Sequence, residues 1–139
     1  EEKIKKISEG AKRLGLNSIS AKLQDGTVFC PDLGEFDRVL CDAPCSGIGI
    51  IGRKPEIKYK KQQELADLPQ IQKKILDTAS RYVKKEGILV YSTCTLLREE
   101  NDQVIEAFLS QHTEFEPCPL PQEVREAAKL TDPAAWKVT

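Results

Sequence analysis

The sequence predicts an α/β fold with a parallel sheet. Two short apolar runs, residues 39–41 and 88–91, have the length and the flanking turn formers of buried strands. Apolar residues recur at helical spacing between these runs and again after the second one. This strand–helix–strand–helix order is typical of parallel strands joined by right-handed crossovers. The loops that follow the two strands should therefore lie at the same edge of the sheet, where ligands bind in open α/β sheets.

The remaining elements are predicted from periodicity and capping residues. Helices are expected at residues 1–14, 67–84, 99–111 and, as a short one, 122–130. Gly15 stands where a C-terminal cap of the first helix belongs, and Asp67 is a plausible N-cap of the second. Residues 18–23 alternate as a short strand does, and the turn Asp25-Gly26 follows them. At most one further short strand is expected, near residues 115–118.

Composition and charge narrow the range of functions. The 139 residues are 40% hydrophobic and 31% charged, which suits one soluble domain with a single core. A net charge of -1 excludes a strongly basic nucleic-acid coat protein. One loop is nonetheless locally basic, and it could either hold phosphate or be a solvated lysine-rich turn. Its cations are Arg53, Lys54, Lys58, Lys60 and Lys61.

The five cysteines form neither a metal site nor a disulfide framework. Their number is odd, no Cys-x-x-Cys pair occurs, and His112 is the single histidine. We therefore predict no metal. The sequence shows no signal peptide or long apolar run, so a reducing cytoplasm, free thiols and no membrane partner are expected.

The chain after the predicted strand at residues 39–41 carries the clearest functional signal. Asp42 ends the strand, and Pro44, which lacks a ladder donor, turns the chain out of the sheet. Cys45 then lies in a loop just beyond the carboxylate, and Cys94 holds the same place after the second strand. A thiol at a strand end is partly exposed and can be reactive. Cys41, inside the strand, is interpreted as a small hydrophobe.

One motif in this region is rejected. Residues 47–52 match the Gly-x-Gly-x-x-Gly pattern of dinucleotide sites and follow a strand. That pattern requires a helix to begin there. Pro55 disfavours helix at Lys54, and no acidic residue ends a strand about twenty positions later. The match is attributed to coincidence.

Four stretches together resemble a known family. They are Asp42-Ala43-Pro44-Cys45-Ser46-Gly47, Arg53-Lys54-Pro55-Glu56-Ile57-Lys58-Tyr59, Leu89-Val90-Tyr91-Ser92-Thr93-Cys94-Thr95 and Glu99-Glu100-Asn101. At this spacing they are similar to the motifs of S-adenosylmethionine-dependent RNA cytosine-C5 methyltransferases, above all the bacterial small-subunit ribosomal RNA enzymes of the Sun/Fmu or RsmB type. The resemblance runs from about Glu1 to Phe115. It implies a Rossmann-like methyltransferase sheet in a three-layer α/β/α arrangement.

The resemblance also implies catalytic roles. Carbon 5 of cytosine is a weak nucleophile, so a thiolate must first add to carbon 6. The family motif gives that part to Cys94. Asp42 would hydrogen-bond or protonate the base near N3, which stabilises the developing charge. Cys45 would assist the elimination that releases the product.

Binding roles are implied in the same way. Asp25 would lie beside the adenine of S-adenosylmethionine and Pro44 near its methionine moiety, and Asp42 would also bind this cofactor. The cations Arg53, Lys54 and Lys58 would approach the backbone of the substrate, for which ribosomal RNA is expected. The target base must leave its stack to reach such a site, which single-stranded RNA allows at low cost.

The family's glycine-rich cofactor loop and ribose-binding acid, which belong to the first two strands of its sheet, have no match in this sequence. We therefore expect residues 1–139 to be the C-terminal portion of a single catalytic domain, with residues 119–139 an irregular tail anchored by Trp136. The strands at residues 18–23 and 39–41 would flank a gap. Such a fragment should bind S-adenosylmethionine weakly or not at all and be inactive alone, and its exposed strand edges could lead to self-association.

Other functions stay open at this point. The chain could be a non-catalytic RNA- or protein-binding module that uses the basic loop, or a thiol redox or nucleotide-binding α/β domain. Within the methyltransferase interpretation, a tRNA substrate is an alternative to ribosomal RNA, because surface shape and other domains decide that choice.

Overall fold

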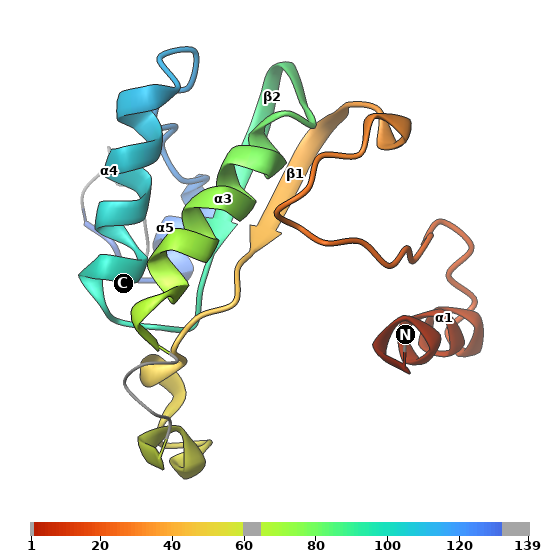
Figure 1. The fold of residues 1–139 in the computed structure, drawn as a ribbon, viewed down its shortest axis with the longest axis horizontal. Helices are drawn as coiled ribbons and strands as arrows, with labels where there is room; N and C mark the ends of the chain where they lie inside the picture. Colours follow the sequence, from red (N-terminus) through yellow and green to blue (C-terminus); the bar gives the residue numbers. More distant parts are fainter. Residues whose placement is uncertain (1, 60–64, 132–139) are drawn as a thin grey trace.

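The computed structural model describes residues 2–59 and 65–131 (Figure 1). At its centre, β1 (Phe36–Asp42) and β2 (Val83–Ser92) pair in parallel, and α3 (Leu68–Ser80) connects them. Helix α4 (Asp102–Gln111) follows β2, so the predicted order of strand, helix, strand and helix is confirmed. Further helical elements among the described residues are α1 (Glu2–Arg13), α5 (Gln122–Ala127) and 3-10 turns at Pro31–Leu33, Ile48–Ile50, Pro55–Tyr59 and Arg98–Glu100.

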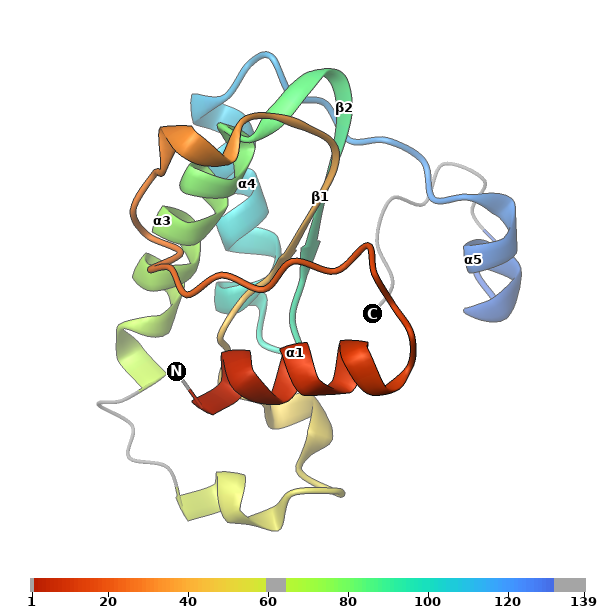
Figure 2. The same ribbon diagram turned by 90° about the vertical axis from the view of Figure 1, so that its right-hand side faces the viewer.

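The core lies between one face of the sheet and two helices. Figures 1 and 2 show α3 and α4 side by side on this face. Cys41 of β1 and Leu89 of β2 point toward them, because alternate strand residues face the same side. They meet Leu76, Val104 and Phe108, which are almost completely buried. Full burial of such a side chain contributes about 1.5–3 kcal/mol, so these residues stabilise the strand ends that carry the site.

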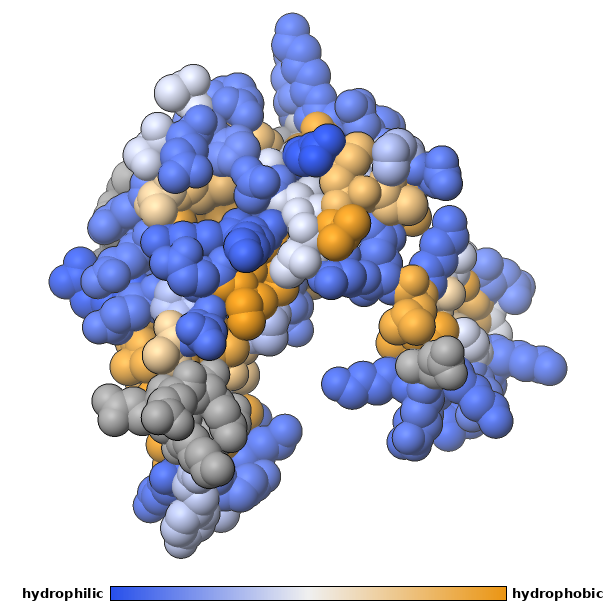
Figure 3. Space-filling view, in the orientation of Figure 1, coloured by the Kyte–Doolittle hydropathy of each residue, from blue (hydrophilic) through white to orange (hydrophobic). Residues whose placement is uncertain are grey.

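The opposite face of the sheet is open among the residues that the structure describes. Leu40 and Val90 project from it with exposed fractions of 69% and 48%. The chain exposes 10665 Å² in all, whereas a compact monomer of this mass exposes about 7,200 Å². Figure 3 shows apolar surface beside β1 and on the separate α1. The fold is thus a mixed α/β structure consistent with an incomplete Rossmann-like sheet.

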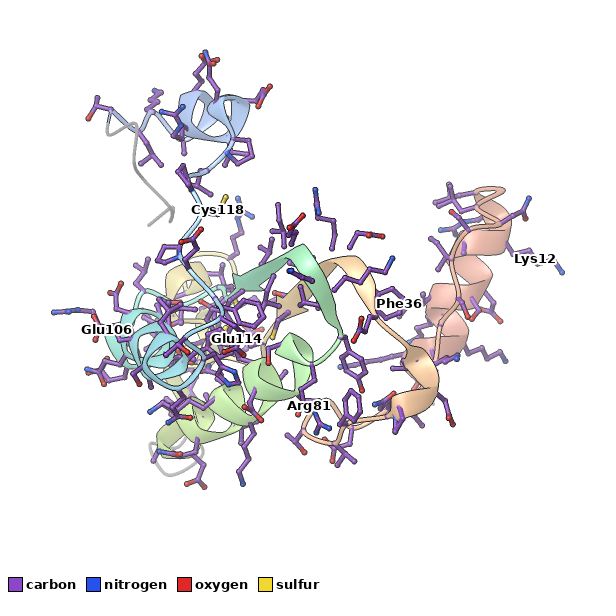
Figure 4. All side chains as sticks on the ribbon, turned by 90° about the horizontal axis from the view of Figure 1, so that it is seen from above. Lys12, Phe36, Arg81, Glu106, Glu114 and Cys118 are labelled. Atoms are coloured by element: carbon purple, nitrogen blue, oxygen red, sulfur yellow. The ribbon has the colours of Figure 1, made fainter. Side chains whose placement is uncertain are left out.

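Helix α1 stands apart from the sheet on the β1 side, and Figure 4 shows Lys12 far from the other labelled residues. Its predicted end is confirmed. Gly15 has a φ of 69°, and the N–H groups of Gly15 and Leu16 donate to the carbonyls of Lys12 and Ala11 at 3.2 and 2.9 Å. This Schellman motif satisfies two terminal carbonyls, and glycine adopts the left-handed conformation at little cost.

The prediction of a strand at residues 18–23 was wrong. This segment is irregular, and the sheet contains only β1 and β2 within the described ranges 2–59 and 65–131. A strand needs a partner for its backbone N–H and C=O groups, which an alternating sequence cannot supply by itself. Ile19 and Leu23 are accordingly 49% and 67% exposed. Residues 115–118, where one further strand was allowed for, are also irregular.

The helix predicted at residues 67–84 ends earlier, at Ser80, because β2 begins at Val83. The sequence Lys84-Lys85-Glu86-Gly87 lies within β2 as an irregularity: Val83 pairs with Phe36, but Ile88 already pairs with Arg38. Glu86 takes up the extra length with a φ of 63°. A helix-terminating sequence therefore serves as a bulge in a strand.

Smaller corrections concern the ends of the helices. Asp67 precedes α3 but makes no side-chain capping hydrogen bond. The helix expected at residues 99–111 begins as a 3-10 turn and becomes α-helical at Asp102, and the one expected at 122–130 ends at Ala127. Trp136, Lys60 and Lys61 lie outside the described residues. None of the described helices has the length and apolar character needed to span a membrane.

Candidate functional site

The loops after β1 and β2 bring two cysteines into contact. Because the strands are parallel and Asp42 is paired with Ser92, both chains leave the sheet at the same edge. The Sγ atoms of Cys45 and Cys94 lie 3.1 Å apart, and the Cys94 N–H donates to Cys45 Sγ at 3.3 Å. Both are free thiols, with Cys94 exposed and Cys45 half-buried. The site thus places a solvent-exposed thiol, Cys94, in contact with a half-buried one, Cys45.

The contact between the thiols affects their ionisation. The hydrogen bond with Cys45 raises the pKa of the Cys94 thiol, and burial and the negative charges of Cys45 and Asp42 act in the same direction. Burial, with a smaller contribution from Asp42, raises the pKa of Cys41 to about 11. Cys41 is therefore an unreactive core thiol, as its position in the strand suggested. Cys94 needs a partner that takes its proton before it can act as a nucleophile.

Asp42 is exposed at the end of β1, beside the thiols. Ser92 Oγ donates to Asp42 Oδ1 at 2.8 Å, and the next residue, Ala43, donates its N–H to the Ser92 carbonyl at 2.9 Å. These two bonds fix the carboxylate at the carboxyl edge of the sheet. Pro44 follows in the exposed loop, and its carbonyl accepts a hydrogen bond from Gln72 Nε2 at 2.9 Å.

Asp25 is placed differently from the other predicted site residues. Asp25 Oδ1 accepts hydrogen bonds from the N–H and the hydroxyl of Thr27 at 2.9 and 2.7 Å. These bonds, the backbone one first, hold the pKa of Asp25 below its ordinary value. The carboxylate is exposed and has the role of a turn residue.

A cleft of about 280 Å³ nevertheless links the Asp25 turn to Asp42. Gln24 and Gly26, which flank Asp25, line one side of it, and Asp42 and Leu40 line another. The cleft runs along β1 toward the carboxyl edge of the sheet. Of the predicted site residues, Asp42 lines this cleft, and its position suits a small molecule bound beside that carboxylate.

A buried polar cluster behind the thiols was not predicted. Its side chains are Ser46, Gln72, Thr95 and Glu100, with exposed fractions of 0%, 0%, 7% and 2%. The helical periodicity of residues 67–84 suggested Ile71 and Ile75 as the buried face, but Gln72 and Leu76 are buried more deeply. The one sequence feature that could have indicated this cluster is a glutamine between core positions of the helix, because a buried amide must hydrogen-bond to other polar groups.

The basic loop lies beside the thiols because Ile57 anchors it. Ile57 is buried, and its Cδ1 comes so close to Gly47 that a Cβ added there would be 3.0 Å away. Arg53, Lys54 and Lys58 are all exposed on the surface of this loop. The loop that carries these three exposed cations thus packs, through Ile57, against Gly47, two residues after Cys45.

Two of the glycines in residues 47–52, Gly47 and Gly49, lie close to Cys94. Gly47 has a φ of 78°, and Gly49 donates its N–H to the Cys94 carbonyl at 3.1 Å. A Cβ on Gly49 would lie 2.9 Å from that carbonyl oxygen, so only glycine permits this approach. The segment forms a 3-10 turn at Ile48–Ile50, not the α-helix that a dinucleotide site needs.

No group of three or more His, Cys, Asp or Glu side chains that could hold a metal ion occurs in the part of the chain that is described. The site is therefore defined by two thiols, one carboxylate, a neighbouring cleft and a basic loop.

Comparisons with known proteins extend over nearly the whole chain. Residues 1–136 match the family described as 16S rRNA methyltransferase RsmB/F. The chain is 50% identical over 133 residues to the probable ribosomal RNA small subunit methyltransferase B of Bacillus subtilis (strain 168), which is 88% of this chain and 29% of that protein. It is 42% identical over 117 residues to ribosomal RNA small subunit methyltransferase B of Photorhabdus laumondii, covering 82% of this chain and 27% of that one.

A solved structure shows the same arrangement. The fold matches the crystal structure of PH0851 with a TM-score of 0.80 at 34% identity, over 86% of this chain and 28% of that one. The chain thus spans less than a third of the length of the relatives it matches. The match of 136 residues and the shared α/β fold lead to one conclusion: the chain belongs to the RsmB/F family of 16S rRNA methyltransferases.

Proposed function

We propose that this chain, as part of a complete enzyme, methylates carbon 5 of a cytosine in ribosomal RNA through a covalent adduct with Cys94. One observation carries the proposal: Cys45 and Cys94 meet at 3.1 Å at the sheet edge where Asp42 ends β1. Cytosine methylation at carbon 5 needs a nucleophile, a base and a group that binds the ring, and this edge offers a side chain for each.

Cys94 is the exposed thiol, so it is the one a flipped-out base can reach. Once its thiol proton has passed to solvent, the thiolate adds to carbon 6, the new bond being S–C6, and the electron pair of the C5–C6 double bond makes carbon 5 nucleophilic. Asp42, oriented by Ser92, stabilises the charge that develops at N3 and the exocyclic amine.

Cys45 suits the second half of the reaction. The adduct still carries a proton on carbon 5 after methylation, and a thiolate at Cys45 removes it. The C5–C6 double bond then re-forms and the S–C6 bond breaks, which returns Cys94 as a thiolate. The Cys94 N–H, directed at Cys45 Sγ, stabilises a negative charge on that sulfur.

The cleft beside Asp42 supports a site for S-adenosylmethionine, because Asp42 and the two neighbours of Asp25 line it. Asp25, Asp42 and Pro44 would hold it, the carboxylates accepting hydrogen bonds from its amino and hydroxyl groups. Bound there, it would supply the methyl group. The cleft is open along β1 in this chain, so we expect residues 1–139, as a portion of one catalytic domain, to bind it weakly and to be inactive alone. Calorimetric titration of the chain with S-adenosylhomocysteine checks this, and saturable micromolar binding would contradict it.

Arg53, Lys54 and Lys58 would contact phosphates of the RNA. They are exposed on a loop that Ile57 fixes next to the thiols. Each cation that neutralises a phosphate releases counterions, so replacing one by glutamine should weaken RNA binding in a salt-dependent way.

The experiment that tests the reaction uses the full-length protein that contains this chain. Cys94→Ala should abolish methylation of ribosomal RNA, whereas Cys45→Ala should trap an RNA adduct that withstands denaturation. Cys118→Ala is the matched control, since Cys118 is exposed on the segment before α5, outside the two loops that carry Cys45 and Cys94 (Figure 4). Unchanged methylation in both site variants would overturn the mechanism.

The close thiols also favour a second candidate, a thiol redox domain. Its prediction is a reversible disulfide between Cys45 and Cys94 as the working reaction. In that case Cys94→Ala would leave RNA methylation of the full-length protein unchanged, which separates the two candidates.

A further inference from the structure

We propose that Glu100 is a positioning residue that sets the distance between Cys45 and Cys94. Its carboxylate connects the residue after one cysteine to the residue after the other. The catalytic consequence rests on the proposed function, but the geometric role does not.

The two oxygens of Glu100 reach the two catalytic loops separately. Oε2 accepts the N–H of Ser46, which follows Cys45, at 2.8 Å. Oε1 accepts the hydroxyl of Thr95, which follows Cys94, at 3.4 Å. The hydroxyls of Ser46 and Thr95 are also within 2.8 Å of each other. A single carboxylate therefore closes a small hydrogen-bonded ring between the loops.

Helix α3 supports this ring through Gln72. Its Nε2 donates to Glu100 Oε2 and to the Pro44 carbonyl, both at 2.9 Å. Because both partners are acceptors, the orientation of the amide is determined. Pro44 precedes Cys45, so the Cys45 loop is held on both sides of the thiol, once by α3 and once by Glu100.

Glu100 is itself fixed relative to β2. Its backbone carbonyl accepts the hydroxyl of Tyr91 at 2.8 Å, and its N–H donates to Leu97 at 3.2 Å. The side chain is only 2% exposed. Burying a carboxylate lowers the stability of the fold by several kcal/mol unless hydrogen-bond donors surround it. An uncharged side chain would therefore serve better at a position needed only for packing. Three donors aimed at this carboxylate indicate that its hydrogen bonds have a purpose.

The proposal can be tested in the chain as it is, using disulfide formation to measure the distance between the thiols. In glutathione buffers, one glutathione disulfide oxidises the thiol pair to a disulfide and is reduced to two glutathiones. The equilibrium constant gives the effective concentration of one thiol at the other. Alkylation followed by mass spectrometry of the Cys45 and Cys94 peptides measures it.

Glu100→Gln keeps the shape of the side chain but replaces one acceptor by an NH₂ group. We expect it to lower the effective concentration by about tenfold or more, since small displacements change reactivity steeply. Glu106→Gln is the matched control: it makes the same substitution at an exposed site on α4 (Figure 4) and should stay within about twofold of the unmodified chain.

A second variant decides the question if Glu100→Gln does not fold, as judged by circular dichroism. Thr95→Val removes the hydroxyl from the ring at nearly constant volume and should lower the effective concentration in the same direction. Thr95→Ser keeps the hydroxyl and should restore it. An effective concentration within about twofold of the unmodified chain in the folded variants would overturn the positioning role.

In the full-length enzyme, Glu100→Gln should lower kcat for methylation and leave KM for RNA unchanged, because the carboxylate touches neither substrate nor thiol. Because a smaller folded fraction would also lower the apparent kcat, kcat is calculated per folded enzyme, with the folded fraction measured by circular dichroism. If Cys94→Ala keeps full methylation, the proposed function fails, whereas the thiol measurement on the chain still decides the role of Glu100.

Discussion

The thiol side and the cofactor side of the site are built in different ways. Cys45 and Cys94 are supported by a buried polar cluster that joins three segments, and Glu100 at its centre is 2% exposed. The turn of Asp25 is exposed, and its hydrogen bonds are made mostly within the turn itself. The proposed base-binding part of the site is therefore held in place by contacts within this chain. The proposed cofactor-binding part has few such contacts.

The segment of the Asp25 turn is tethered to the core mainly through Tyr82. The Tyr82 hydroxyl accepts the Cys30 N–H at 2.7 Å and Gln24 Nε2 at 3.1 Å, and Phe29 stacks on its ring at 4.9 Å. The guanidinium of Arg81 lies 3.7 Å from the centre of the Phe29 ring. Contacts with Tyr82 and Arg81 thus hold the segment of the Asp25 turn, whereas several buried groups hold the thiol side.

The largest expected effect is a loss of stability when a leucine under the covered face of the sheet is replaced, compared with one on the open face. Leu76 is 1% exposed and Leu40 is 69% exposed. Leu76→Ala should lower the free energy of unfolding by about 3 kcal/mol through lost burial and a cavity. Leu40→Ala should change it by no more than about 0.5 kcal/mol. Urea unfolding of both variants measures this difference.

The open face also offers a check on self-association. If Leu40→Ala destabilises the chain as strongly as Leu76→Ala, the open face is covered in solution, and the stability should then rise with protein concentration. Self-association through this face would be contradicted if the free energy of unfolding is the same at two protein concentrations and Leu40→Ala leaves it unchanged.

The next effect concerns the tether of the cofactor side. Tyr82→Phe keeps the ring but removes the acceptor of the Cys30 N–H, which should cost about 1 kcal/mol locally. Hydrogen exchange at residues 24–30 should accelerate. Alkylation of Cys45 and Cys94 should stay as it is. Faster alkylation of the thiols in this variant would show that the two sides are coupled.

A smaller effect tests the thiol pair alone. Because the hydrogen bond with Cys45 raises the pKa of Cys94, Cys45→Ala should lower that pKa. The alkylation rate of Cys94 with iodoacetamide should then rise at a lower pH than in the unmodified chain, as followed on its peptide. Cys118→Ala should leave the profile of Cys94 in place. An unchanged profile in Cys45→Ala would mean that the two sulfurs are not in contact.

The smallest effect is expected at an exposed ion pair on the edge of the sheet. Lys84 Nζ lies 3.1 Å from Asp37 Oδ1, and its hydrogen bond holds the pKa of Asp37 below the ordinary value. A depressed carboxyl pKa adds stability above its unfolded pKa and loses it as the pH falls, here below about pH 4. Asp37→Asn should therefore be slightly less stable at pH 7 and equal in acid. Thermal unfolding of both proteins across this pH range measures the difference in stability between them. High salt should abolish that difference at pH 7, because it screens the exposed ion pair.

The sequence was a good guide to the order of the elements and to the thiols. Residues 39–41 and 88–91 are parts of β1 and β2, and Cys45 and Cys94 follow these strands as expected. These predictions succeed because apolar runs and proline act on the nearest few residues. The error at residues 18–23 has the opposite cause, since an alternating segment becomes a strand only when a neighbouring strand pairs with it.

Local periodicity and backbone restriction are enough to predict the α/β order, the cap at Gly15 and the two loops that carry thiols. The packing of Glu100 and Gln72 against Ser46 and Thr95, and the irregular course of residues 18–23, depend on the folded arrangement of the whole chain. Hydrogen bonds between residues far apart in the chain leave no periodic trace, because each partner looks like an ordinary polar residue until folding brings the other one to it.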